Sequence, residues 1–102
     1  MSVLEIVKWK AKPNVSNKKI IDAVNTMVPD LKKLKGFISQ TLYKDEDDNW
    51  IDIYYWDTTE NAHLSNERMA DKESLKNLLE LILLESVSME VLKPLQNAEL
   101  SN

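Results

Sequence analysis

The stretch that decides the fold is Trp50-Ile51-Asp52-Ile53-Tyr54-Tyr55-Trp56, whose aromatic and β-branched side chains are typical of a strand. Side chains alternate between the two faces of a strand. One face therefore carries Trp50, Asp52, Tyr54 and Trp56, and the other carries Ile51, Ile53 and Tyr55. Because both faces are largely apolar, we expect both to be covered.

The chain before this stretch predicts two strands and a helix. Val3 to Ala11 is a first strand, with Glu5, Val7 and Trp9 on the same face as Val3, and Leu4 and Ile6 on the other. Ser16 is a good N-cap for a helix beginning at Asn17. Within this helix, residues at helical spacing form an apolar stripe: Ile20, Ile21, Val24, Met27, Val28, Leu31 and Leu34.

Two residues modify the end of that helix. Pro29 should kink or divide it, because proline has no N–H to donate to the preceding turn. Gly36 stands where a C-cap residue belongs. Phe37 to Lys44 then predicts the second strand, and residues 45–49 predict the hairpin leading into Trp50.

After Trp56 the pattern becomes helical and then extended. A helix capped by residues 57–59 runs to about Ala70, and a further helical piece restarts at Asp71 or Lys72. Ser86 to Leu95 predicts the last strand, and residues 96–102 form a polar tail. The order βαββαβ predicts an α+β fold, a ferredoxin-like sandwich with a four-stranded antiparallel sheet, as one domain over residues 1–95.

Composition narrows the functions open to this chain. Its 102 residues suffice for one domain, and its net charge of −4 disfavours nucleic acid and anionic membrane surfaces as partners. The absence of cysteine excludes disulfides and thiolate sites. Gly36 is the only glycine, so a glycine-rich phosphate loop cannot be built. Glu5 and Lys8 interrupt any apolar signal segment, and we expect a cytoplasmic protein.

The face bearing Trp50, Asp52, Tyr54 and Trp56 predicts a second chain. In a monomer of this kind, helices cover one sheet face and water wets the other. Together with Trp9 of the first strand, the patch would contain three tryptophans and a tyrosine, which is more than a monomer normally exposes in one patch. We therefore expect a second copy of the chain to cover that face, giving a homodimer.

The layout resembles the dimeric α+β barrel superfamily, and within it the antibiotic biosynthesis monooxygenase-like family. The residues that carry this resemblance, which spans about residues 2–95, are Val3–Lys10, Lys35–Ser39, Trp50–Trp56 and Glu85–Glu90. The resemblance implies that two sheets pair into a barrel. It also implies a cofactor-independent oxygenase, although the superfamily includes haem-degrading enzymes and other activities.

A barrel of this kind would be lined by Glu5, Val7, Trp9, Asp52, Tyr54 and Trp56. When two carboxylates lie in a partly dry cavity, the pKa of one of them rises. That carboxylate can then act as a general base that deprotonates a phenol or enol. The anion reacts with dioxygen without a cofactor, as the resemblance implies. Asp52 and Tyr54 are the predicted catalytic residues.

The predicted substrate-binding residues are Glu5, Trp9, Trp56 and Asn66. The tryptophans would stack on a small phenolic or quinol-like molecule. The resemblance implies that an Asn, a Trp, a Tyr and an Arg serve in such sites. Asn66 is a candidate for the first of these, and Arg68 is the only arginine.

Several alternatives remain open at this point. The tryptophans are more often packing at a dimer seam than pocket walls, and the two acids are more often hydrogen-bond acceptors in the structure. His63 and Glu67 share a helix face, but zinc catalysis normally needs three protein ligands, so we expect no metal and no cofactor. A non-enzymatic ligand-binding module and a structural or stress-associated homodimer are the alternative functions.

Overall fold

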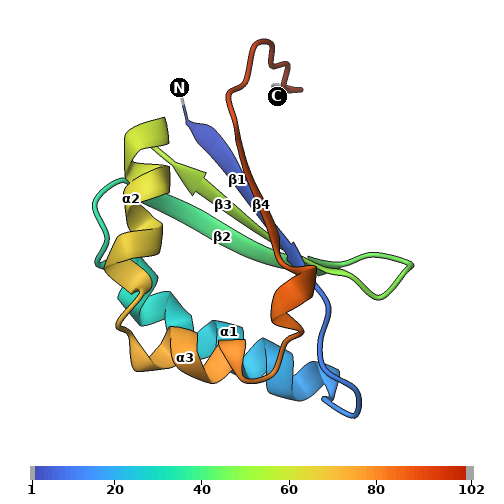
Figure 1. Cartoon of the computed structure of the whole chain (residues 1–102). Coiled ribbons are helices and arrows are strands. Elements are labelled where there is room, and N and C mark those ends of the chain that lie inside the picture. The colour runs from blue at the N-terminus through green and yellow to red at the C-terminus, as the bar shows by residue number, and fades with distance from the viewer. Residues whose placement is uncertain (1, 101–102) are drawn as a thin grey trace.

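The secondary structure follows the predicted order. The computed structural model describes residues 2–100. Its elements, drawn in Figure 1, are β1 (Val3–Trp9), α1 (Asn17–Lys32), β2 (Phe37–Lys44), β3 (Trp50–Trp56), α2 (Thr59–Met69), α3 (Glu73–Leu79), a 3₁₀ helix (Leu84–Ser86) and β4 (Ser88–Leu92).

The four strands form one antiparallel sheet in the order β2-β3-β1-β4. This confirms the predicted ferredoxin-like fold, and it places β1 and β3 side by side. In the register of these two strands, Val3 lies opposite Trp56, Glu5 opposite Tyr54 and Val7 opposite Asp52. Opposite residues share a sheet face, so the acids and the aromatic residues gather on one face.

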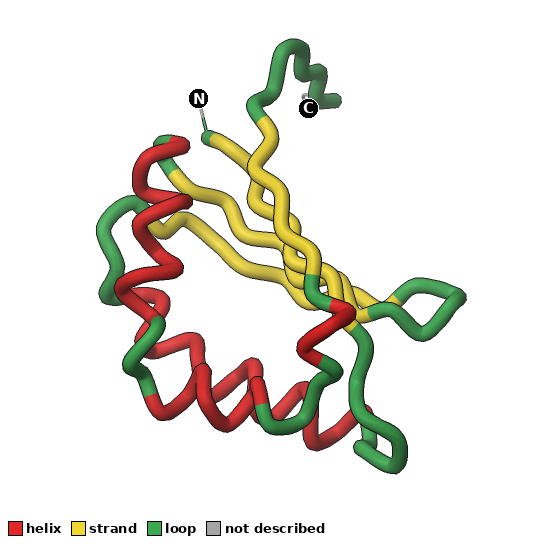
Figure 2. Tube along the Cα trace, in the orientation of Figure 1, coloured by secondary structure: helices red, strands yellow, loops and turns green. Residues whose placement is uncertain are grey.

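The three α-helices lie on one side of the sheet (Figure 2). α1 and α3 pack against each other as a layer, and α2 runs from the end of β3 toward that layer (Figure 1). A hydrogen bond of 2.6 Å from the Ser74 hydroxyl to Asp30 Oδ2 links α3 to α1. In the described part of the chain, no helix covers the opposite sheet face.

α1 begins as predicted and is not divided. Its N-cap is Ser16, whose Oγ accepts the Lys19 backbone N–H at 3.2 Å. One face is buried, through Ile20, Val24, Met27 and Leu31. The helix runs through Pro29 to Lys32, so the predicted division is wrong. Pro29 lies in the last turn, where little helix remains to be interrupted.

Gly36 is not the C-cap of α1, contrary to the prediction. The helix ends at Lys32, and Lys33 follows with an ordinary right-handed backbone. Gly36 lies in the turn before β2 with φ of +86°, and a Cβ there would overlap Asp57 Oδ1. Glycine is thus required both by its backbone and by the close approach of the segment after β3.

β1 and β4 are both shorter than predicted. β1 ends at Trp9, and Ala11 forms only an isolated bridge with Ile82. β4 spans Ser88–Leu92 rather than 86–95: it starts later because the preceding residues form the 3₁₀ helix, and it ends at Leu92, the last residue paired with β1. The Ser86 side chain stabilises this turn, accepting the Lys10 backbone N–H at 2.9 Å and donating to the Leu83 carbonyl at 2.6 Å.

A β-bulge near the start of β2 sets which of its residues face the helices. The pairing with β3 shifts register between Phe37 and Ser39. Phe37 lies opposite Trp56, and beyond the shift Gln40 lies opposite Tyr54. The extra residue reverses the alternation, so Phe37 and Gln40 share the helix-covered face although three positions separate them.

Membrane-spanning helices are not found among residues 2–100: each helix there is too short or too polar to cross a bilayer.

Candidate functional site

The helix-covered face of the sheet is the one bearing Trp9, Asp52, Tyr54 and Trp56. Within a single chain the exposed fractions are 2% for Trp9 and 1% for both Asp52 and Trp56. The prediction that a second copy covers this face is therefore wrong, because the chain's own helices cover it. A strand with two apolar faces does not itself indicate which face the helices take.

The open face, which we call the outer face, is the one that lacks a helix. Its apolar side chains on β1 and β3 are Leu4, Ile6, Ile51, Ile53 and Tyr55. The pairing register adds Tyr43 and Leu92 from the flanking strands, and both of these are exposed.

A cavity of about 480 Å³ lies between the sheet and the helices of the same chain. It is large enough for a small organic molecule. Its position corrects the expectation of a cavity between two sheets. The sheet side contributes Glu5, Val7, Trp9, Asp52, Tyr54, Trp56 and Met89. The remaining lining is Met27, Leu31, Ser65, Asn66, Met69, Ala70, Leu75, Leu78, Leu79, Ile82 and Val87.

The mouth of the cavity is marked by the lining residues that remain exposed. These are Asn66 on α2, Ala70 directly after α2, and Met89 on β4, whose exposed fraction is 47%. Glu5 and Asp52 are buried at 3% and 1% exposed. A molecule entering between α2 and β4 would therefore pass the Asn66 amide and the Met89 side chain before it reaches the acids.

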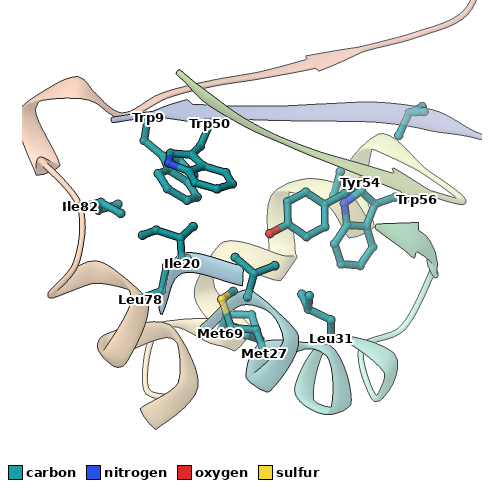
Figure 3. Packing of buried hydrophobic residues seen from close by; sticks show 13 residues of the cluster. Trp9, Ile20, Met27, Leu31, Trp50, Tyr54, Trp56, Met69, Leu78 and Ile82 are labelled. Atoms are coloured by element: carbon teal, nitrogen blue, oxygen red, sulfur yellow. The ribbon is translucent and has the colours of Figure 1, made fainter. Parts of the chain in front are cut away.

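Aromatic pairs occupy two regions of the sheet face (Figure 3). Trp9 stacks on Trp50, with ring centroids 5.8 Å apart, and Tyr54 stacks on Trp56 at 6.3 Å. Phe37 contacts Trp56 edge-on at 5.7 Å. In Figure 3 the Tyr54 hydroxyl points away from Trp56, into the region between the two pairs. The packed rings fix the orientation of that hydroxyl.

Asp52 is held through both of its carboxyl oxygens. Gln40 Nε2 donates to Oδ1 at 2.7 Å, and the Tyr54 hydroxyl donates to Oδ2 at 2.5 Å. Burial raises the pKa of Asp52, and the bonds from Gln40 and Tyr54 oppose that shift in part. Burial, followed by the charge of Asp52, raises the pKa of Tyr54 well above its usual value. Tyr54 therefore keeps its proton and donates to Asp52.

Glu5 is held through only one carboxyl oxygen. Trp56 Nε1 donates to Oε1 at 3.0 Å. Among the described residues, Oε2 is a buried side-chain atom without a hydrogen-bond partner. Burial raises the pKa of Glu5, the bond from Trp56 opposes this, and the nearby charge of Asp52 raises it further. Glu5 thus lines the cavity with one oxygen free to accept a proton or a hydrogen bond.

All of the predicted site residues line this one cavity: Glu5, Trp9, Asp52, Tyr54, Trp56 and Asn66. His63, Glu67 and Arg68 do not line it, and the first two are exposed on α2. Among residues 2–100, no group of three or more His, Cys, Asp or Glu side chains could hold a metal ion.

Sequence reasoning missed Gln40, the amide that holds Asp52. Alternation counted from Phe37 puts Gln40 on the outer face, and only the bulge brings it inside. Apart from Asn66, the helix side of the cavity was also missed. Its residues, such as Met69 and Leu78, have the spacing of ordinary core positions, which does not distinguish a cavity wall from a packed core.

Comparison with known proteins supports the fold. No family model matches the chain, and no curated protein matches it. Solved structures do match. A candidate antibiotic biosynthesis monooxygenase from Bordetella bronchiseptica has a TM-score of 0.79 at 16% identity, over 93% of this chain and 98% of that one.

Two further structures agree. SnoaB, a cofactor-independent oxygenase from Streptomyces nogalater, has a TM-score of 0.76 at 11% identity, over 94% of this chain and 95% of its own. A protein of unknown function from Nitrosomonas europaea has a TM-score of 0.72 at 12% identity, over 99% and 96%. The resemblance inferred from the sequence is thereby confirmed at the level of the fold.

Proposed function

We propose that this protein is a cofactor-independent oxygenase acting on a small phenolic or quinol-like molecule in the cavity between its sheet and helices. The observation that carries the proposal is the pairing of an apolar cavity of about 480 Å³ with two buried acids, Glu5 and Asp52, on its sheet side. The fold shared with SnoaB, described as a cofactor-independent oxygenase, agrees with it.

The cavity suits a flat, mostly apolar substrate with a hydroxyl group. Trp9 and Trp56 offer aromatic surface on the sheet side, and aliphatic and methionine side chains form most of the remaining wall. Asn66 provides an amide near the mouth. The polar groups are few and lie chiefly along β1 and β3, so a bound phenol would turn its hydroxyl toward Glu5 and Asp52.

The chemistry begins with transfer of the phenol proton to a buried carboxylate, whose raised pKa makes it a stronger base. The phenolate gives one electron to dioxygen, and the superoxide and phenoxyl radical combine as a peroxide on the carbon para to the oxygen. The carboxylic acid returns its proton to the peroxide, and loss of the proton on that carbon with cleavage of the O–O bond then gives a quinone and water. One phenol and one dioxygen are consumed, and the substrate loses the four electrons that dioxygen gains.

Oxygen uptake tests this function directly. We would supply phenols with a free para position and measure dioxygen consumption together with quinone absorbance. The expected result is one quinone per dioxygen. The double variant Glu5→Gln/Asp52→Asn lacks both acids and should lower the rate by about 10²–10⁴-fold, the usual contribution of a general base. Glu46→Gln/Asp47→Asn, in the exposed hairpin, is the matched control and should keep the rate.

Other outcomes would select the alternatives. A phenol that binds in the cavity but drives no oxygen uptake would reject the oxygenase and indicate a ligand-binding module without turnover. If no phenol binds at all, the structural or stress-associated role becomes the better explanation of the fold.

A homodimer is the second part of the proposal, on a different face from the one first expected. A second copy would cover the outer face, where Ile51, Ile53 and Tyr55 line the middle strand and Leu4 and Ile6 lie beside them. An apolar sheet face of this kind is unusual in a monomer and self-complementary in a symmetric pair.

A further inference from the structure

We infer that Glu5, rather than Asp52, is the group that takes the proton from a phenol in the cavity, and that Asp52 is a positioning residue that holds Tyr54. This inference rests on the proposed function and identifies the acceptor atom as Glu5 Oε2. The reasons lie in how the two carboxyl groups are bonded.

Both carboxyl oxygens of Asp52 already accept hydrogen bonds. Gln40 donates to Oδ1 at 2.7 Å and Tyr54 to Oδ2 at 2.5 Å, and both donors are held by the sheet. To take a proton from a substrate, Asp52 would have to weaken one of these charge-assisted bonds. The bond from Tyr54 also keeps the phenol ring of that residue fixed against Trp56. Asp52 is therefore suited to orienting Tyr54.

One carboxyl oxygen of Glu5 is available to a bound molecule. The side chain is only 3% exposed and lines the cavity, yet among residues 2–100 its Oε2 has no donor. Trp56 Nε1, bonded to Oε1 at 3.0 Å, restrains the carboxyl group. Buried acceptors in folded proteins nearly always have a partner. A hydroxyl on a bound molecule would supply the one that is missing.

The charges around Glu5 favour proton transfer to it. The titratable groups that line the cavity with it are Asp52 and Tyr54, both from β3. The lining from the three helices and β4 carries no ionisable side chain in the described chain. When a phenol gives its O–H proton to Oε2, one O–H bond breaks and another forms. The negative charge moves from the carboxylate to the ring, so the net charge of the buried site is unchanged.

Transfer of the proton can be seen with 4-nitrophenol, whose phenolate absorbs in the visible and whose phenol does not. We would titrate the probe with protein at a pH about one unit below the pKa of the probe, where the free probe is mostly protonated. The wild type should produce the phenolate band. Glu5→Gln should remove at least nine-tenths of it. Asp52→Asn takes away a charge that raises the pKa of Glu5, so it should weaken the band, but less than Glu5→Gln does. The control Glu90→Gln, exposed on β4, should retain the full band.

The ether 4-nitroanisole, which has no proton to give, reports whether the cavity is intact in each variant. It should bind to Glu5→Gln as to the wild type. Should Glu5→Gln not fold, Glu5→Asp, which withdraws the carboxyl by one methylene, should give a weaker band than the wild type. A band that survives in Glu5→Gln, or that Asp52→Asn removes as completely, would overturn the inference, as would its absence from the wild type.

The two proposals fail in different ways. The nitrophenol band needs no dioxygen, so proton transfer to Glu5 would stand even if no substrate drives oxygen uptake. Conversely, full oxygen uptake by Glu5→Gln would overturn the role of Glu5 while leaving the oxygenase in place.

Discussion

At the scale of single residues, the distinctive feature is a pair of acids buried where acids are costly. Glu5 and Asp52 lie on the sheet side of an apolar cavity, and burial raises the pKa of each. Folded proteins tolerate such groups where their chemistry is used, and perturbed acids cluster at functional sites. The same shifts make the stability of the fold depend on pH.

The direction of that dependence follows from proton binding. The ordinary pKa values are 4.5 for Glu5 and 3.8 for Asp52, and both are higher in the folded chain. The folded state therefore binds more protons than the unfolded state above these values. The contribution of the two acids to stability is greatest below their ordinary pKa values and is lost as the pH rises through the raised ones.

We predict that the double variant Glu5→Gln/Asp52→Asn does not show this loss of stability with rising pH. Urea unfolding from pH 3 to pH 8 should show that the free energy of unfolding of the wild type, relative to the variant, falls as pH rises. Asp45, whose pKa is lowered by its bonds with Asn49, acts in the opposite direction but is common to both proteins. Parallel pH curves would show that the two acids are not perturbed.

At the scale of elements, α2 and β4 form the two sides of the cavity mouth. α2 and its C-cap contribute Asn66 and Ala70, and β4 contributes Met89, which lies opposite Val7 in the sheet. Methionine is flexible and can yield to an entering molecule. Access to the acids between α2 and β4 therefore passes a side chain of an edge strand.

We predict that Met89→Trp obstructs this mouth. The larger ring should weaken 4-nitroanisole binding about tenfold or more, equivalent to about 1.4 kcal/mol or more. The thermal stability of the Met89→Trp variant should differ little from that of the wild type, because Met89 is half exposed. The control, Asn77→Trp, places the same ring on the exposed side of α3 and should leave binding unchanged. Equal binding by both variants would place the entrance elsewhere.

At the scale of the whole molecule, the two faces of the sheet have different surroundings. One face is closed by the helices and holds the cavity. The outer face carries Ile51, Ile53 and Tyr55 on β3, and Leu4 and Ile6 lie beside them on β1. If a second copy covers the outer face, each chain keeps a complete cavity of its own.

We predict that Ile53→Lys disrupts the homodimer. Sedimentation should give twice the chain mass for the wild type and the single-chain mass of 11.8 kDa for the variant, because a lysine at the centre of an apolar interface would be buried without a partner. Glu67→Lys, on the exposed surface of α2, should remain a dimer. A wild type of 11.8 kDa would reject the dimer outright.

The sequence predicts the elements and their order because hydrophobic periodicity is a local property. It also predicts which side chains share a face: Glu5, Asp52, Tyr54 and Trp56 do meet. Which of two apolar faces receives the helices is not a local property, because it depends on how the helices fill the space beside each face. That choice was predicted wrongly, and with it the position of the cavity.

The details within the cavity escaped prediction for a related reason. The bulge in β2 reverses the facing of Gln40, and nothing in the sequence around Ile38 marks it. The free oxygen of Glu5 depends on the placement of Trp56 Nε1, an atom 51 residues away in the chain. Periodicity identifies residues that face the same way, but a hydrogen bond depends on individual atoms.

The gathering of every tryptophan on the helix-covered face has an optical consequence. Trp9, Trp50 and Trp56 are the only indoles in the chain, and all three are buried there, two of them stacked at 5.8 Å. The near-ultraviolet emission of this protein therefore arises almost wholly beside the cavity. An absorbing guest would quench it by energy transfer, and coupling between the stacked rings would give the folded state its own circular dichroism. The protein carries a built-in spectroscopic reporter of whatever occupies its interior.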